Sequence, residues 1–220
     1  MTRILLVPSP LLGAPSWGEV PASMAAASRD IEVVDTSGVR APGQLVDVVA
    51  AAAGGAPVVL VPHSNAGLAV PELLSRVDVR AAVFVDAALP LGGGEAALAP
   101  PGLLAMLESL ADDEGLLPPW TAWWDDLAGV FPDDAARAAV EAGQPQLPLS
   151  YFTATLPVPD GWASGPFGYL AFGETYAEEV AFARARGWPV TVLDGRHLHQ
   201  LHDPAGVARA VLDLVDRLAD

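Results

Sequence analysis

Residues 58–67 constrain this chain more than any other segment. Their first five residues, Val-Val-Leu-Val-Pro, form an apolar run typical of a buried strand, and the run stops at a turn of small residues that carries Ser64. Residues 68–74 then have the pattern of a helix. A serine on a sharp strand-to-helix turn is lifted above the sheet, with the helix N-terminus beneath it. We therefore expect an accessible Ser64 hydroxyl, with the next backbone N–H, that of Asn65, facing any oxyanion formed there.

Short apolar runs alternate with helical stretches along most of the chain. This pattern predicts a mostly parallel sheet of about six strands with helices on both faces. The expected strands are residues 4–7, 31–34, 58–61, 82–85, 168–172 and 190–193, and the expected helices between them are 20–27, 44–53, 68–76 and 177–186. Active sites in such sheets lie at the carboxyl ends of the strands. The residues with suitable chemistry at those ends are Ser64, Asp86, Glu174 and His197.

The C-terminal part of the chain contains a histidine loop between a predicted strand and a predicted helix. Residues 188–193 have the pattern of a buried strand, and residues 205–218 have that of an amphipathic helix. Asp203 is expected to cap this helix and Pro204 to occupy its first position. His197 lies seven residues before Pro204.

The serine turn and the histidine loop together resemble the α/β-hydrolase superfamily, in which the serine precedes the histidine along the chain. The resemblance covers residues 3–90 and 166–218. It implies that Ser64 is the nucleophile, that His197 is the general base, and that the first strand here corresponds to the family's third. The turn departs from the family pattern Gly-x-Ser-x-Gly, because Pro62 and Ala66 stand at the glycine positions and Gly67 follows one residue later.

The acid that would orient His197 has two candidates. The family's usual position follows residues 168–172, where Glu174 lies and where Tyr176 occupies the place in which Asp is most often found. Some family members place the acid one strand earlier, where Asp86 lies. Thr175 and Glu178 have the spacing of a capping box for the next helix.

The resemblance also implies an oxyanion hole built from two backbone N–H groups. One is expected from Asn65 and the other from the loop that follows the first strand. Pro8 and Pro10 in this loop have no N–H. Leu11 is therefore the candidate for the second donor.

Residues 91–165 match the family only as a lid, and we expect them to form a helical cap over the strand ends. The predicted helices are residues 103–110, 121–130 and 133–142. Trp120, Trp123 and Trp124 are expected to border a substrate pocket, together with His199. The histidines at 197, 199 and 202 lack an accompanying cysteine or carboxylate pattern, so we expect neither a metal site nor a cofactor.

Composition limits the class of partner and the compartment. The 220 residues are 52% apolar, which suits a single domain over residues 1–220. The net charge of −16 disfavours binding to nucleic acid and to anionic membranes. The absence of cysteine, of a signal peptide and of a long apolar run leads us to expect a cytoplasmic protein that acts on a small molecule.

The sequence thus predicts a serine-dependent esterase or thioesterase for a small to medium apolar or aromatic acyl substrate. The α/β-hydrolase fold also hosts lyases, epimerases and cyclases, some of which tailor natural products, and such a non-hydrolytic enzyme is the alternative prediction. A binding protein without catalytic turnover is the third.

Overall fold

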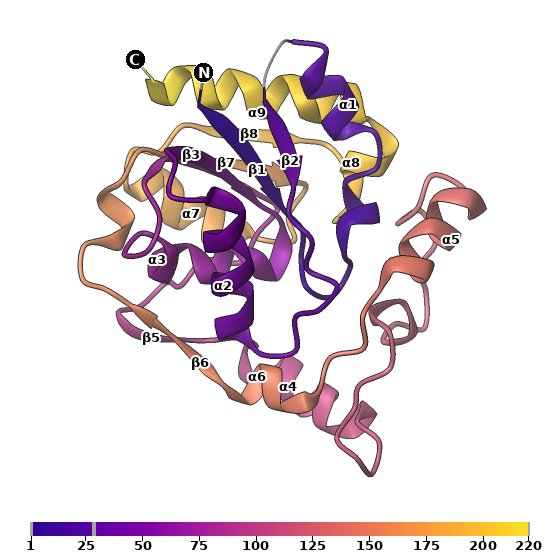
Figure 1. Ribbon diagram of the computed structural model, residues 1–220. Helices are drawn as coiled ribbons and strands as arrows, with labels where there is room; N and C mark the ends of the chain where they lie inside the picture. The colour runs from indigo at the N-terminus through magenta and orange to yellow at the C-terminus, as the bar shows by residue number, and fades with distance from the viewer. Residues whose placement is uncertain (1, 28–29, 220) are drawn as a thin grey trace.

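The computed structural model describes residues 2–27 and 30–219, and it is built on a six-stranded parallel sheet (Figure 1). The strand order is β2-β1-β3-β4-β7-β8, and every neighbouring pair is parallel. The strands are β1 (Arg3–Val7), β2 (Ile31–Val33), β3 (Val58–Pro62), β4 (Val79–Val85), β7 (Phe167–Phe172) and β8 (Val190–Leu193). This is the sheet that the sequence predicted, with β4 three residues longer at its start. The chain adds β2 on one side of β1 and the later strands on the other side, so the strand order switches between β1 and β3. In open α/β sheets, the crevice at such a switch point holds ligands.

Helices cover both faces of the sheet because its strands alternate side chains between two apolar cores. The helices α1 (Val20–Ala25) and α9 (Pro204–Ala219) cover one face, where Ile4, Leu6 and Val83 point. The helices α2 (Pro42–Ala53), α3 (Val70–Leu73) and α7 (Ala177–Ala185) cover the other, where Leu5, Leu60 and Phe84 point.

Two helix boundaries were tested by the structure with different outcomes. The prediction for Asp203 is confirmed, since its Oδ1 accepts a hydrogen bond from the N–H of Gly206 at 2.8 Å and α9 begins at Pro204. The capping box of Thr175 and Glu178 is wrong. The residue that precedes α7 is Tyr176, and its side chain makes no capping hydrogen bond within the described helix. Tyr176 is instead directed to the cavity described below.

Residues 91–165 form the most irregular part of the structure. Their elements are β5 (Gly94–Ala97), α4 (Pro101–Leu110), η3 (Trp120–Ala122), α5 (Asp134–Gly143), α6 (Leu149–Thr153), β6 (Thr155–Val158) and η4 (Trp162–Ser164). The strands β5 and β6 pair antiparallel, which the sequence did not predict. The predicted helix 121–130 is wrong: a single 3-10 turn follows Pro118 and Pro119, and Gly129 adopts a positive φ of 70°. Figure 1 shows α4, α5 and α6 lying to one side of the sheet rather than against its helical layers.

Three short helical elements complete the chain and lie near the serine turn. They are η1 (Ala14–Trp17), η2 (Ser64–Ala69) and α8 (His199–His202). None of the helices formed by residues 2–27 and 30–219 combines the length and apolar character that a membrane crossing requires.

Candidate active site

Ser64 lies on a strained turn directly after β3. Its φ of 57° is in the left-handed region, which non-glycine residues rarely adopt. The turn is tight because η2 passes close to the chain after β4: a Cβ on Gly67 would collide with the carbonyl oxygen of Ala88. The glycine required by this contact is therefore three residues after the serine, which accounts for the shift from the family pattern. Backbone strain of this kind is typical of a position where geometry serves chemistry.

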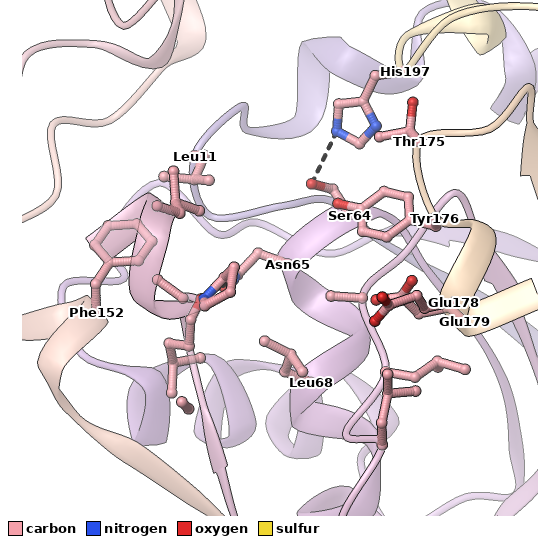
Figure 2. A pocket seen from close by; sticks show the side chains of 18 of the residues that line it. Leu11, Ser64, Asn65, Leu68, Phe152, Thr175, Tyr176, Glu178, Glu179 and His197 are labelled. Atoms are coloured by element: carbon pink, nitrogen blue, oxygen red, sulfur yellow. Dashed lines mark hydrogen bonds between the residues drawn. The ribbon is translucent and has the colours of Figure 1, made fainter. Parts of the chain in front are cut away.

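Ser64, His197 and Asp86 form a continuous hydrogen-bonded chain. The Ser64 hydroxyl donates to His197 Nε2 at 3.0 Å, and His197 Nδ1–H donates to Asp86 Oδ2 at 2.7 Å. Figure 2 shows the His197 ring directly above Ser64. Asp86 is 0% exposed at the end of β4, and its Oδ1 accepts a hydrogen bond from the N–H of Phe172 at 2.9 Å. Asp86 also has a positive φ, of 40°. This chain fixes the His197 tautomer and leaves Nε2 free to accept the serine proton.

Glu174, the other acid that the sequence left open, occupies a different position. It lies in the exposed turn after β7 and lines the cavity in front of Ser64. Within the described residues, the His197 ring is hydrogen bonded by Asp86 and Ser64 and not by Glu174. The strand end that carries Asp86 is thus the one that meets the histidine loop.

His63 is a functional candidate that the sequence analysis did not identify. It is fully buried, and its Nε2–H donates to the carbonyl oxygen of His197 at 3.1 Å. Its ring stacks on that of His197 at 4.9 Å between centroids, and the edge of Trp17 lies 5.9 Å away. Burial, and then the nearby His197, hold the pKa of His63 well below its usual value. A neutral His63 therefore supports the histidine loop from behind.

The side chain of Asn65 ties the serine turn to residues 91–165. Its Nδ2 donates to the carbonyl oxygen of Leu98 at 2.8 Å, and its Oδ1 accepts a hydrogen bond from the Tyr151 hydroxyl at 3.0 Å. Asn65 is the single asparagine of the chain. Because these two bonds hold its side chain, the backbone N–H of Asn65 is positioned next to Ser64.

The backbone N–H groups of the loop after β1 are hydrogen bonded within that loop. The N–H groups of Leu12 and Gly13 both donate to the carbonyl oxygen of Ser9, at 3.0 Å each. Leu11 lines the cavity, as expected of an oxyanion residue, but its N–H donates to Ser9 Oγ at 3.3 Å. The predicted second oxyanion donor is therefore engaged within its own loop in this structure.

A cavity of about 710 Å³ opens in front of Ser64. This volume is in the range of sites for small molecules. Trp120, Trp123 and Trp124 all line it, and the Trp120 ring lies 6.2 Å from that of His197. Most of the remaining wall is aliphatic and comes from three places in the chain: residues 88–91 after β4, residues 97–103 at and after β5, and Leu68 in η2.

His199 does not line this cavity, so the prediction that it contributes to the pocket is wrong. Its ring packs against that of Phe172 at 5.4 Å and stacks on that of His202 at 6.2 Å. The short helix α8 causes this difference, because it turns the side chain of His199 away from His197. Among the described residues, no three His, Cys, Asp or Glu side chains are grouped to hold a metal ion.

The polar part of the cavity wall is acidic. Glu174, Glu178 and Glu179 line it, and Figure 2 shows the last two below Tyr176. Burial raises the pKa of the half-buried Glu179. No arginine is among the described lining residues, and the chain has no lysine.

Comparisons with solved structures show the same fold at low sequence identity. An extracellular α/β-hydrolase from a Paenibacillus species, described as sharing homology with tobacco salicylic acid binding protein 2, superposes with a TM-score of 0.76 at 18% identity, over 97% of this chain and 99% of that one. A methylesterase from Arabidopsis gives 0.72 at 16%, over 98% and 99%. Tomato methylketone synthase I gives 0.70 at 14%, over 99% and 98%. No protein-family model and no curated sequence matches the chain. The chain therefore has the α/β-hydrolase fold, as its sequence predicted.

Proposed function

We propose that this protein is a serine-dependent hydrolase of carboxylic esters. The observation that carries the proposal is the hydrogen-bonded chain from Ser64 through His197 to Asp86, whose Ser64 and His197 line a largely apolar cavity. A serine is a weak nucleophile by itself, and an adjacent base oriented by a third group is what activates it. The esterases and hydrolases among the proteins of the same fold agree with this class of reaction.

The proposed mechanism has two halves. His197 Nε2 takes the Ser64 proton while Ser64 Oγ attacks the ester carbonyl, and Asp86 stabilises the imidazolium that forms. The Asn65 N–H donates to the oxyanion. His197 then returns its proton to the departing alcohol, which leaves an acyl-serine. Water, deprotonated by His197, releases the acid and restores Ser64.

The cavity favours a neutral ester with an apolar or aromatic acyl group. The three tryptophans and the aliphatic residues of the wall offer an apolar surface. Three glutamates and the absence of a described cationic lining residue disfavour an anionic group near Ser64. Among the acyl donors predicted from sequence, this argues against thioesters that carry phosphates, such as those of coenzyme A, since nothing in the described wall would balance their charge.

A fluorophosphonate probe tests the proposal on the purified protein. We expect stoichiometric labelling of Ser64, loss of labelling and of p-nitrophenyl ester hydrolysis in Ser64→Ala, and no change in Ser75→Ala. Ser75 is an exposed serine whose hydroxyl binds the carbonyl oxygen of Glu72, so it controls for serine removal as such. Absence of labelling, or labelling at another serine, would contradict a covalent serine mechanism.

A non-hydrolytic reaction at the same site is the second candidate. The observation that favours it is the loop after β1, whose Leu11, Leu12 and Gly13 N–H groups are all bonded to Ser9. A hydrolase usually draws its second oxyanion donor from this loop, and a lyase or epimerase has less need of it. Methylketone synthase shows that the fold is not restricted to proteins named as hydrolases. Ester panels that give no acid product from a protein labelled at Ser64 would favour this candidate.

A further inference from the structure

The side-chain amide of Asn65 is fixed at both of its ends. Its Nδ2 donates to the carbonyl oxygen of Leu98 at 2.8 Å, and its Oδ1 accepts a hydrogen bond from the Tyr151 hydroxyl at 3.0 Å. Because a backbone carbonyl can only accept, Nδ2 must face Leu98 and Oδ1 must face Tyr151. The amide therefore has one orientation, and Figure 2 shows the Asn65 side chain pointing away from the hydroxyl of Ser64.

Tyr151 contacts the serine turn from outside the cavity. Its side chain is 1% exposed, and it is not among the described residues that line the cavity in front of Ser64. Burial raises the pKa of Tyr151, so its phenol keeps the proton that it donates to Asn65. Loss of a partner in so dry a place would leave a polar atom unpaired, which costs about 1–3 kcal/mol.

The antiparallel pair of strands β5 and β6 brings the two partners of this amide together. Leu98 directly follows β5, and α6, which carries Tyr151, directly precedes β6. The register pairs Ala97 with Thr155 at this end of the two strands. The β5–β6 pair therefore sets where the acceptor and the donor for the amide lie.

The serine turn needs such support from outside, because its backbone is strained. Ser64 has a φ of 57°, and a conformation of this kind persists only where the surrounding structure holds it. In the proposed ester hydrolysis, the oxyanion is hydrogen bonded by the backbone N–H of Asn65. The N–H groups of residues 11–13 are bonded to Ser9 and do not share this task. A donor that works alone must be placed accurately, since a displacement of about 1 Å can lower a rate by about 10².

We propose that Tyr151 is a positioning residue for catalysis, whose hydroxyl holds the Asn65 side chain and thereby keeps the Asn65 N–H directed to the oxyanion; this rests on the proposed ester hydrolysis. Tyr151 exchanges no proton and does not contact the substrate. Bond formation and proton transfer remain with Ser64 and His197.

The test compares Tyr151→Phe with the wild type. Removing the hydroxyl should lower kcat for a p-nitrophenyl ester by about 5- to 50-fold, less than the loss of a full oxyanion donor. KM should change by less than about twofold, because no residue of the cavity wall is altered. The affinity for a trifluoromethyl ketone, which forms a hemiketal oxyanion with Ser64, should fall by a factor similar to that for kcat. The affinity for the matched methyl ketone, which binds largely as the intact ketone, should stay within about twofold.

A double-mutant cycle tests whether Tyr151 acts through Asn65. Asn65→Ala removes both hydrogen bonds, so it should lower kcat at least as much as Tyr151→Phe, with the same difference between the two ketones. In the Asn65→Ala background, Tyr151→Phe should change kcat by less than about twofold, because its partner is already gone. Thr121→Val is the control: it removes a hydroxyl bonded to Gln144 Oε1 at 3.2 Å and should leave kcat and both ketone affinities unchanged, even where the melting temperature falls.

Three results would overturn the positioning role. They are an unchanged kcat in folded Tyr151→Phe, equal losses of affinity for the two ketones, and losses that multiply in the double mutant. If Tyr151→Phe does not fold, Asn65→Ala still decides through the two ketones. A wild type that neither hydrolyses the ester nor prefers the trifluoromethyl ketone would instead refute the proposed hydrolysis, and the role of Tyr151 with it.

Discussion

Replacing Asp86 with asparagine gives the sharpest test of the hydrogen-bonded chain. The Oδ1 atom of Asp86 accepts the N–H of Phe172, and Oδ2 faces His197 Nδ1. In Asp86→Asn, the amide oxygen retains the bond from Phe172, so the amide NH₂ must take the place of Oδ2. Two donors then face each other, and His197 is driven to the tautomer with its proton on Nε2, which cannot accept the proton of Ser64.

The expected loss of activity follows from this geometry. The Nδ1 to Oδ2 distance of 2.7 Å places the charge centres of carboxylate and imidazolium roughly 4 Å apart, which is worth about 4 kcal/mol at an effective dielectric constant of about 20. At 1.36 kcal/mol per power of ten, this corresponds to a loss of about 10³ in kcat. The wrong tautomer adds to it, and the same substitution in other Ser-His-Asp enzymes costs about 10⁴. We therefore expect a loss of about 10³ to 10⁴ in kcat for Asp86→Asn.

Glu174→Gln is the matched comparison, since it also exchanges a carboxylate for an amide at the cavity. Glu174 is exposed and forms no bond to the described His197 ring, so its effect should stay below about fivefold, equivalent to about 1 kcal/mol for a solvent-screened charge. Steady-state kinetics on one p-nitrophenyl ester, with circular dichroism to verify folding, decides between them. A loss for Glu174→Gln as large as that for Asp86→Asn, or a loss below tenfold for Asp86→Asn in a folded protein, would refute the reasoning.

Three further predictions concern stability and folding. The pKa of the buried His63 is lower in the folded protein than in the unfolded chain, so its contribution to stability is full above about pH 6.5 and falls on acidification by up to about 1.4 kcal/mol per pH unit. Urea titrations from pH 8 to 5 should therefore show that the unfolding free energy depends less steeply on pH in His63→Asn than in the wild type, and an equal dependence in both proteins would contradict this. Gly67→Ala should destabilise the protein by about 1–3 kcal/mol, because its Cβ would collide with the carbonyl oxygen of Ala88, and an unchanged midpoint of chemical unfolding would show that the turn can relax. Asp203→Ala should cost about 1 kcal/mol through loss of the α9 cap, with Asp203→Asn close to the wild type; equal losses in both variants would argue against capping.

Sequence patterns predicted the structure well where residues close together in the chain decide it. Alternating apolar strands and helices predicted the six-stranded parallel sheet, because two-sided burial leaves its mark on every strand. Asp203 and Pro204 predicted the start of α9, because capping acts over only three residues. Ser64 was identified from its turn for the same reason: the strained step from β3 to η2 requires small residues close to it in sequence.

Local signals failed where packing between distant segments decides the outcome. The sequence placed both Asp86 and Glu174 at strand ends, and only the register of β4 beside β7 and the path of the histidine loop bring Asp86 to His197. Thr175 and Glu178 had the spacing of a capping box, yet the segment before α7 adopts a conformation that directs Tyr176 to the cavity in front of Ser64.

The same holds for the orientation of the remaining side chains. His199 turns away because α8 winds into a single helical turn, which four residues with two histidines do not specify. His63 stacks behind His197 only when residues 134 positions apart are brought together. The sequence alone therefore predicted the strands of the sheet, the start of its last helix and which serine lies on the strained turn after β3. Tertiary structure determined which side chains meet that serine, because such contacts depend on strand order and loop paths rather than on neighbours in the chain.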